Sequence, residues 1–251
     1  MRILVTNDDG IDAPGLAAPV AALRRLAHEV VVVAPDGNRS GTGHAITYGV
    51  PVTVRRHRMA AAPAFAVAGT PADCIRVAPR FWGAPPDLVV SGINRGANLG
   101  PDIHRSGTVG AAREAALMGL PALALSAVHE FAAVPDLARR LPTLIDLALS
   151  FPGSLLNVNL PDARAASWVM VPAADTLGAH QRTVREVGRD TWEVDVWRGP
   201  AESAAGDDTL TDLEAVRSGL IAITVVPVLS RARTPQHQTT VRGVETLAGP
   251  I

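Results

Sequence analysis

The stretch TNDDG, residues 6–10, contains two adjacent carboxylates, Asp8 and Asp9, and follows directly after the mostly apolar run Met1 to Val5. Neighbouring negative charges repel each other, and each carboxylate also loses hydration where a strand leaves a protein core. A bound cation would offset both costs. In the simpler interpretation, the two residues form an Asx turn and cap the next helix. The stretch TNDDG alone leaves both interpretations open.

Ser40 and Asn94 lie where two further predicted strands end, and we expect them near the acidic pair. In an open α/β sheet, ligands bind beyond the carboxyl ends of the strands, so loops far apart in sequence can converge there. All four side chains offer hard oxygen atoms, and no cysteine or histidine cluster competes with them. Such a set favours Mg²⁺, Mn²⁺ or Ca²⁺ over a structural zinc.

The segment GPDIHRSGTVGAA predicts an anion-binding helix N-terminus at the same edge of the sheet. Ser106, Gly107 and Thr108 would present backbone amides and two hydroxyls to a phosphate, and the helix dipole would strengthen that interaction. Alternatively, Ser106 only caps the helix and the glycines only turn the chain. A divalent cation beside a phosphate seat is an arrangement that polarises a phosphoryl oxygen and activates water.

Three other phosphate-handling classes fit the sequence poorly. A P-loop needs a lysine, and this chain contains none, since all 23 of its basic residues are arginine. The loop NDDGIDAPG lacks the G-x-G-x-x-G pattern of a dinucleotide fold, and GTGHAI lacks its third glycine. In a phosphoaspartate phosphatase, Asn7 would stand where the nucleophilic aspartate belongs, and a carboxamide cannot form the acyl phosphate.

The elements that must position these residues are those of a doubly wound α/β sheet. Residues 1–7 and 29–35 read as buried strands, and Leu16, Val20 and Leu23 between them have helical spacing. This strand-helix-strand unit predicts parallel strands and a right-handed connection.

Further elements extend that sheet as far as residue 161. We expect a hairpin or edge excursion at 51–56 and 64–71, strands at 86–94, 120–126 and 155–161, and helices at 106–119 and about 134–149. The fold class is therefore α/β, with a Rossmann-like, doubly wound and mostly parallel sheet.

After residue 161 the pattern changes to strands at 167–172, 191–199 and 219–227, with a short helix at about 210–218. We predict a catalytic core at 1–161 and a β-rich C-terminal extension at 162–251, packed on the core and serving assembly.

Composition limits the function further. The 23 basic and 24 acidic residues nearly cancel, so no global field would hold a nucleic acid duplex. The single cysteine, Cys74, excludes an intrachain disulfide and lies in an apolar setting. Without a signal peptide or an apolar stretch of about 18 residues, we expect a cytoplasmic protein that does not enter membranes.

Several long stretches resemble the SurE (survival protein E) family of nucleotidases. They are ILVTNDDGIDAPGL, VVAPDGNRSGTGHAIT, GTPADC, VSGINRGANLG, SGTVGAAREAALMGLPALALS, LNVNLP and, more loosely, TDLEAVRSGLIAITVVP. They occur in the family's order and extend from residue 3 to about residue 227.

The resemblance implies a metal-dependent hydrolase that removes phosphate from nucleoside 5′- or 3′-monophosphates. It implies one divalent cation per subunit, Mg²⁺ or Mn²⁺, held by Asp8, Asp9, Ser40 and Asn94. It also implies a homodimer or homotetramer built through the C-terminal extension. The phosphate-contacting loop would contain Ser106, Gly107 and Thr108, and Gly41 and Asn98 could join it.

The sequence leaves the general acid and the turnover of nucleotide open. His44 and His104 lie in loops at the correct edge, but loop histidines are mostly surface residues, and neither is assigned as the general acid. The alternative function is a nucleotide-binding or sensing protein that uses the same seat without turnover, and only a turnover measurement separates the two. A structural assembly protein, suggested by the C-terminal extension alone, is a weaker third class.

Overall fold

The computed structural model describes residues 1–128, 137–161, 167–174, 180–189, 191–198 and 210–228. Among these residues, nine strands form one sheet in the order β3-β4-β2-β1-β5-β6-β7-β11-β8. Their bounds are β1 Arg2–Thr6, β2 Glu29–Pro35, β3 Val54–His57, β4 Ala64–Val67, β5 Leu88–Arg95, β6 Ala122–Ala127, β7 Ser154–Leu160, β8 Trp168–Met170 and β11 Ile221–Pro227.

The central strands are parallel and buried on both faces. β1 pairs in parallel with β2 and β5, and β6 pairs in parallel with β5 and β7. Antiparallel pairing occurs toward the two sides of the sheet, between β3 and β4 and between β7 and β11. The predicted α/β, mostly parallel fold class is confirmed.

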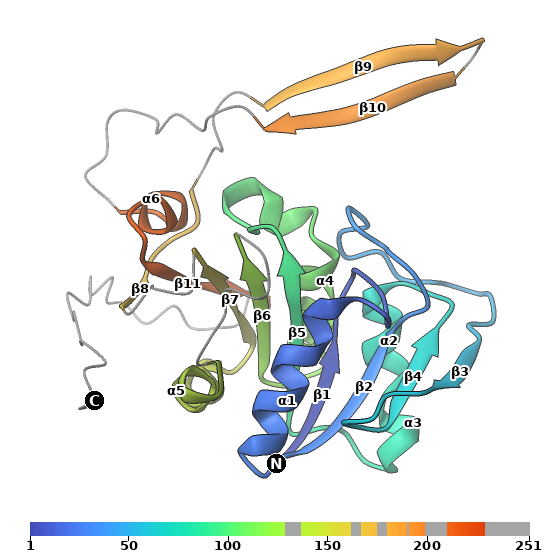
Figure 1. Ribbon diagram of the computed structural model, residues 1–251, viewed down its shortest axis with the longest axis vertical. Coiled ribbons are helices and arrows are strands. Elements are labelled where there is room, and N and C mark those ends of the chain that lie inside the picture. Colours follow the sequence, from blue (N-terminus) through green and yellow to red (C-terminus); the bar gives the residue numbers. More distant parts are fainter. Residues whose placement is uncertain (129–136, 162–166, 175–179, 190, 199–209, 229–251) are drawn as a thin grey trace.

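Helices cover both faces of the sheet, as Figure 1 shows. On one face lie α1 and α5, and on the other lie α2 and α4, which contact each other. The helical bounds are η1 Pro14–Leu16, α1 Ala17–Arg25, α2 Pro71–Val77, α3 Pro79–Trp82, η2 Gly100–His104, α4 Gly107–Leu117, α5 Leu137–Ser150 and α6 Asp212–Arg217.

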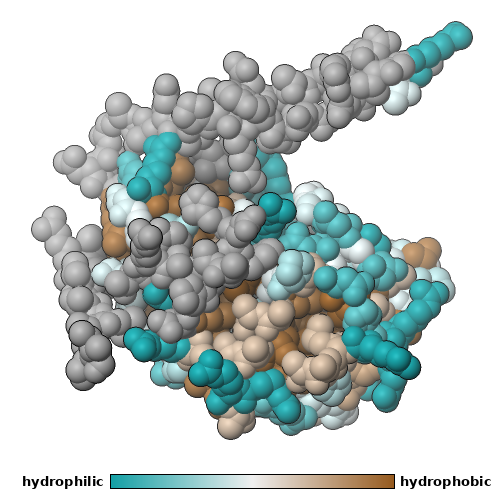
Figure 2. Space-filling model, viewed as in Figure 1, coloured by the Kyte–Doolittle hydropathy of each residue, from teal (hydrophilic) through white to brown (hydrophobic). Residues whose placement is uncertain are grey.

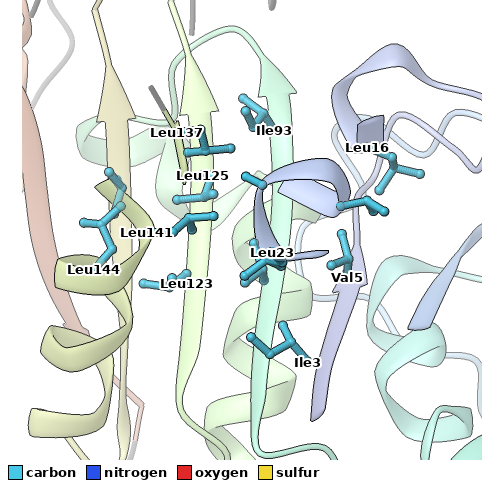
Figure 3. Close-up of a cluster of buried hydrophobic side chains, with 14 of the residues drawn as sticks. Ile3, Val5, Leu16, Leu23, Ile93, Leu123, Leu125, Leu137, Leu141 and Leu144 are labelled. Atoms are coloured by element: carbon cyan, nitrogen blue, oxygen red, sulfur yellow. The ribbon is translucent and has the colours of Figure 1, made fainter. Parts of the chain in front are cut away.

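Two apolar layers hold the helices to the sheet. Figure 3 shows the first layer, in which Leu23 of α1 and Leu141 of α5 are fully buried with Ile3 and Leu123 of the strands. The second layer lies under α2 and α4 and is rich in alanine, which lets α4 approach the sheet closely. Cys74 belongs to this second layer and is completely buried, as expected for a structural thiol.

On the face viewed in Figure 2, hydrophilic residues fringe an apolar area over α1. Within the described ranges, no helix combines the length and the apolar character needed to cross a bilayer.

The chain after residue 161 contributes to two sheets. β8 and β11 extend the main sheet, and β11 pairs with β7 and β8. A separate two-stranded antiparallel hairpin consists of β9 (His180–Gly188) and β10 (Thr191–Arg198), which projects away from the main sheet in Figure 1. The domain boundary at residue 161 stays a prediction.

Several boundaries differ from the sequence-based expectation. The strand predicted at 64–71 ends at Val67, because Thr70 caps the unpredicted helix α2. The helix predicted from the spacing of Leu16, Val20 and Leu23 begins as η1 and becomes α-helical only from Ala17 to Arg25. The predicted helix at about 134–149 is seen as α5, and residues 134–136 lie outside the described residues.

Candidate metal and phosphate site

Asp8 lies at the end of β1, and its side chain faces the first turn of α4. The Thr108 hydroxyl donates a hydrogen bond to Asp8 Oδ1 over 2.5 Å. Gly107 also packs closely against Asp8. A Cβ added to Gly107 would lie 2.7 Å from Asp8 Cβ and 2.9 Å from Asp8 Oδ2. Asp8 is only 3% exposed. The first acidic residue and the predicted phosphate seat therefore form one site.

The loop after β2 is fixed to the same edge through the backbone of Asp8. The N–H of Arg39 donates to the Asp8 carbonyl oxygen over 2.7 Å. Ser40, the next residue, is exposed, and its hydroxyl donates to Asn38 Oδ1 over 2.6 Å. Ser40 therefore follows a residue whose backbone contacts Asp8, but the described hydrogen bonds include none from the Ser40 side chain to either carboxylate. Gly41 is exposed and has a positive φ of 77°.

Asp9 faces the end of β5, the neighbouring strand. Its Oδ2 accepts a hydrogen bond from the Arg95 N–H over 3.4 Å. Asn94, the residue before Arg95, is partly buried, and its side-chain amide donates to the Gly96 carbonyl over 2.8 Å. The backbone thus brings Asn94 and Asp9 to adjoining strand ends.

Burial and mutual repulsion disfavour the charged forms of the acidic pair. Burial raises the pKa of Asp8 above its ordinary value of 3.8, while hydrogen bonds from the Thr108 hydroxyl and from the backbone of Thr108 and Gly107 oppose the rise. Burial also raises the pKa of Asp9, and the charge of Asp8 adds to that rise. The backbone and charge of Arg95 act in the opposite direction.

These electrostatics fit a bound divalent cation. Among the described residues, neither Asp8 nor Asp9 takes part in an ion pair. A divalent ion would neutralise both carboxylates, offset the cost of their burial and remove the repulsion that contributes to the raised pKa of Asp9. No group of three or more His, Cys, Asp or Glu side chains suited to a metal occurs in the described part of the chain. Hydroxyl, amide and water oxygens would therefore complete the coordination, as Mg²⁺ and Mn²⁺ prefer.

Ser106 caps α4, as one of the two interpretations of the sequence expects. Its hydroxyl accepts a hydrogen bond from the Val109 N–H over 3.1 Å. The cap fixes the direction of the first turn, whose Gly107 and Thr108 backbone amides face the Asp8 carboxylate. The same residue can therefore shape an anion site without contacting the anion through its side chain.

Asn98 is held by a buried network of polar side chains that the sequence analysis missed. Its backbone N–H donates to Asn159 Oδ1 over 2.8 Å, and its side-chain amide donates to the Ser126 hydroxyl over 2.8 Å. The Asn98 carbonyl accepts from the amides of Asn157 and Asn159 at 2.7 and 3.0 Å. Polar residues at alternate positions of the otherwise apolar strand LLNVNLP were the available signal.

The two candidate histidines have different surroundings. His44 Nε2 lies 2.8 Å from Glu114 Oε2, so its ring is held against the outer part of α4. Arg76 Nε also approaches Glu114, at 3.7 Å from Oε1. His104 is exposed at the end of η2. The described hydrogen bonds and ion pairs join neither histidine to the acidic pair, and neither is assigned as the general acid.

Comparisons with known proteins agree with this arrangement. A family model described as Survival protein SurE matches residues 3–183. A protein of Xanthomonas campestris pv. campestris (strain B100), called 5′-nucleotidase SurE, is 42% identical over 241 residues, covering 91% of this chain and 90% of that protein. A protein of the same name from Xanthomonas oryzae pv. oryzae (strain PXO99A) is 40% identical over 262 residues, covering 99% and 95%.

A solved structure extends the similarity to three dimensions. The crystal structure of the SurE protein from Aquifex aeolicus matches with a TM-score of 0.73 and 30% sequence identity. The match covers 92% of this chain and 95% of that one. The family match thus extends from sequence to fold over nearly the whole length. The chain therefore belongs to the SurE family.

Proposed function

We propose that this protein is a metal-dependent phosphomonoesterase that hydrolyses nucleoside 5′- and 3′-monophosphates to nucleoside and phosphate. The name 5′-nucleotidase, given to the curated relatives, supports the hydrolase and the nucleotide substrate. In this proposal Asp8, Asp9, Ser40 and Asn94 hold one divalent cation, Mg²⁺ or Mn²⁺.

The observation that carries the proposal is the contact between the acidic pair and the N-terminus of α4. Asp8 meets Thr108 and Gly107, so a cation on its carboxylate would lie beside the amides that bind phosphate. Phosphoryl transfer needs charge stabilisation on the transferring group more than covalent help from the protein. A cation and a helix N-terminus on adjoining sides of one phosphate supply that stabilisation.

The roles of the protein groups follow from their contacts. In this proposal the Thr108 hydroxyl orients the Asp8 carboxylate, and the first turn of α4, capped by Ser106, would share its backbone amides between Asp8 and the phosphate. Gly41 and Asn98 would lie at the rim of the phosphate site. Burial of Asp8 keeps water away from one side of the site. The bound cation would supply Lewis acidity toward a phosphoryl oxygen and toward the attacking water.

Assembly and location form the remaining part of the proposal. The isolated hairpin β9–β10 supports a homodimer or homotetramer built through the C-terminal extension, because a lone two-stranded hairpin is only marginally stable in water. We place the protein in the cytoplasm, without a nucleic acid or membrane partner.

A panel of phosphomonoesters tests the proposed function. Phosphate release would be measured from nucleoside 5′-monophosphates, nucleoside 3′-monophosphates and p-nitrophenyl phosphate, with Mn²⁺, with Mg²⁺ and with excess EDTA. The proposal expects release from both nucleotide classes, abolished by EDTA and restored by added metal. Saturable nucleotide binding without release would contradict it and favour a sensor. Release that persists in EDTA would contradict the metal assignment.

A further inference from the structure

Asp212 is a second buried carboxylate, distant in sequence from the acidic pair. It is the first residue of α6 and is fully buried, with 0% exposure. Its Oδ2 accepts the N–H of Gly100 over 2.9 Å, and its Oδ1 accepts the N–H of Ala174 over 2.8 Å. Its own N–H donates to the Pro172 carbonyl over 2.9 Å. One side chain therefore joins α6 to two separate loops.

The first of these loops carries residues that the proposed function assigns to phosphate. Gly100 opens η2 and follows Asn98 by two positions. Hydrogen bonds connect the rest of this turn. The Asp102 carbonyl oxygen accepts hydrogen bonds from the N–H groups of Arg105 and Ser106, each over 3.0 Å. Ser106 then caps α4. A displacement of Gly100 would therefore reach both Asn98 and the start of α4.

The surroundings of Asp212 are apolar and buried, so water could not easily replace the hydrogen bonds that its carboxylate accepts. Leu99, Ala174 and Leu213 form a small buried cluster around the junction, with Ala97 and Val216 packed against it. Burial raises the pKa of Asp212, and the backbone N–H groups of Gly100 and Ala174 oppose that rise. A buried charge is costly unless it is well hydrogen-bonded, so the two N–H donors and the carboxylate depend on each other.

We propose that Asp212 is a positioning residue for phosphate binding: its carboxylate bridge sets the 98–106 loop against the 172–174 segment, which precedes β9 in the sequence. The inference rests on the proposed function for the roles of Asn98 and Ser106. Asp212 acts through the backbone of Gly100 and does not touch substrate.

Two full-length variants separate this role from simple support of α6. Asp212→Asn keeps the size of the side chain but replaces one acceptor oxygen with an NH₂ group, which would face an N–H donor. Thr211→Ala is the matched control, because the Thr211 hydroxyl caps the same helix through the Glu214 N–H at 3.4 Å. No hydrogen bond of the described residues joins Thr211 to Gly100 or Ala174. Both variants would be compared with the parent by hydrogen exchange and by kinetics.

The positioning role predicts different results for the two variants. In Asp212→Asn, exchange of the 97–106 amides should rise about tenfold, the consequence of losing one hydrogen bond to a charged group. KM for a nucleoside monophosphate should rise about tenfold with kcat changed less than about threefold, because Asp8 and Asp9 on the β1 side are untouched. In Thr211→Ala, faster exchange should be confined to α6, and KM should stay within about twofold.

Equal exchange of the 97–106 amides in the two variants would overturn the inference, as would an unchanged KM in Asp212→Asn. If Asp212→Asn does not unfold cooperatively, Asp212→Ser, a smaller neutral acceptor, provides the same comparison. Failure of the proposed function is distinguishable, because the parent would then release no phosphate. The exchange comparison would still decide whether Asp212 holds the loop.

Discussion

The Thr108 hydroxyl and the Asp8 carboxylate are joined by a hydrogen bond of 2.5 Å, although the two residues lie 100 positions apart in the chain. This contact fixes the end of β1 against the beginning of α4. It also selects one orientation of the carboxylate, which otherwise has only its neighbour Asp9 and the backbone around it. The contact therefore connects the proposed metal ligands to the proposed phosphate seat.

Removal of this hydrogen bond should impair catalysis. In Thr108→Val the side chain keeps its shape but loses the hydroxyl that orients Asp8, and we expect kcat/KM for nucleotide hydrolysis to fall by about tenfold or more, as for the loss of a hydrogen bond to a charged group. Thr108→Ser keeps the hydroxyl and should retain most of the activity. Equal losses in the Val and Ser variants would show that the methyl group, and not the hydroxyl, matters.

Gly107 has no room for a side chain. A Cβ at this position would lie 2.7 Å from Asp8 Cβ and 3.1 Å from the Thr42 hydroxyl oxygen, closer than van der Waals contact allows. Gly107→Ala should therefore displace Asp8 or the first turn of α4, with a loss of stability of about 1–3 kcal/mol and a strong loss of activity.

The control for that variant is Gly37→Ala. A Cβ at Gly37 would meet only the flexible Arg39 Nη1, at 3.6 Å, which is an ordinary contact. Phosphate release and thermal unfolding would be measured for both alanine variants. Full activity in Gly107→Ala would contradict the close approach of α4 to Asp8.

Asp9 should destabilise the metal-free protein. Its charge is held beside Asp8 and partly out of water, so Asp9→Asn should raise the stability of the metal-free chain by about 0.5–2 kcal/mol, the range common for such stabilising substitutions. Mn²⁺ should reverse the order, because a ligand that binds only the folded state stabilises the parent and not the variant. Thermal unfolding with EDTA and with Mn²⁺ measures both effects.

The raised pKa values of Asp8 and Asp9 predict how the stability of the metal-free protein changes with pH. Since the folded-state pKa values of Asp8 and Asp9 are raised, their contribution to stability is fully present below the ordinary value of 3.8 and is lost as the pH rises through the raised values. The advantage of Asp9→Asn over the parent should therefore grow from about pH 4 to about pH 7 in EDTA.

Asp146→Asn is the control for this measurement, since Asp146 is exposed and its side chain takes part in no ion pair among the described residues. It should follow the parent throughout the pH range. An advantage of Asp9→Asn that shrinks as the pH rises would contradict the sign of the effect.

Much of the sheet could be predicted from the sequence because parallel strands buried on both faces read as continuous apolar runs. The prediction missed α2, since a helix of seven residues shows too little periodicity. A local signal was present, because Thr70 and Asp73 form a capping box around a proline at the first helical position. The prediction also missed β9, the partner of β10, in the polar stretch HQRTVREVG.

The sequence predicted that the acidic pair and the N-terminus of α4 lie at the same edge of the sheet, but it could not predict the individual contacts between them. The contact between the Thr108 hydroxyl and Asp8 depends on how closely the alanine-rich α4 packs on the sheet. This packing is a property of the tertiary structure. The support of Asn98 by Asn157 and Asn159 comes from a strand that reads mainly as apolar core. Such partners become visible only when the loops and strands are placed in space.

Binding of Mn²⁺ to the metal-free protein is the sharpest test of a metal site at Asp8 and Asp9. Free Mn²⁺ would be measured by electron paramagnetic resonance during titration of the parent, of the Asp8→Asn/Asp9→Asn variant and of Asp12→Asn. We expect one site per chain in the parent and in Asp12→Asn, with affinity at least about 100-fold weaker in the double variant, the scale expected when a coordination site loses both charged ligands. Equal Mn²⁺ affinity in the parent and the double variant would contradict this expectation.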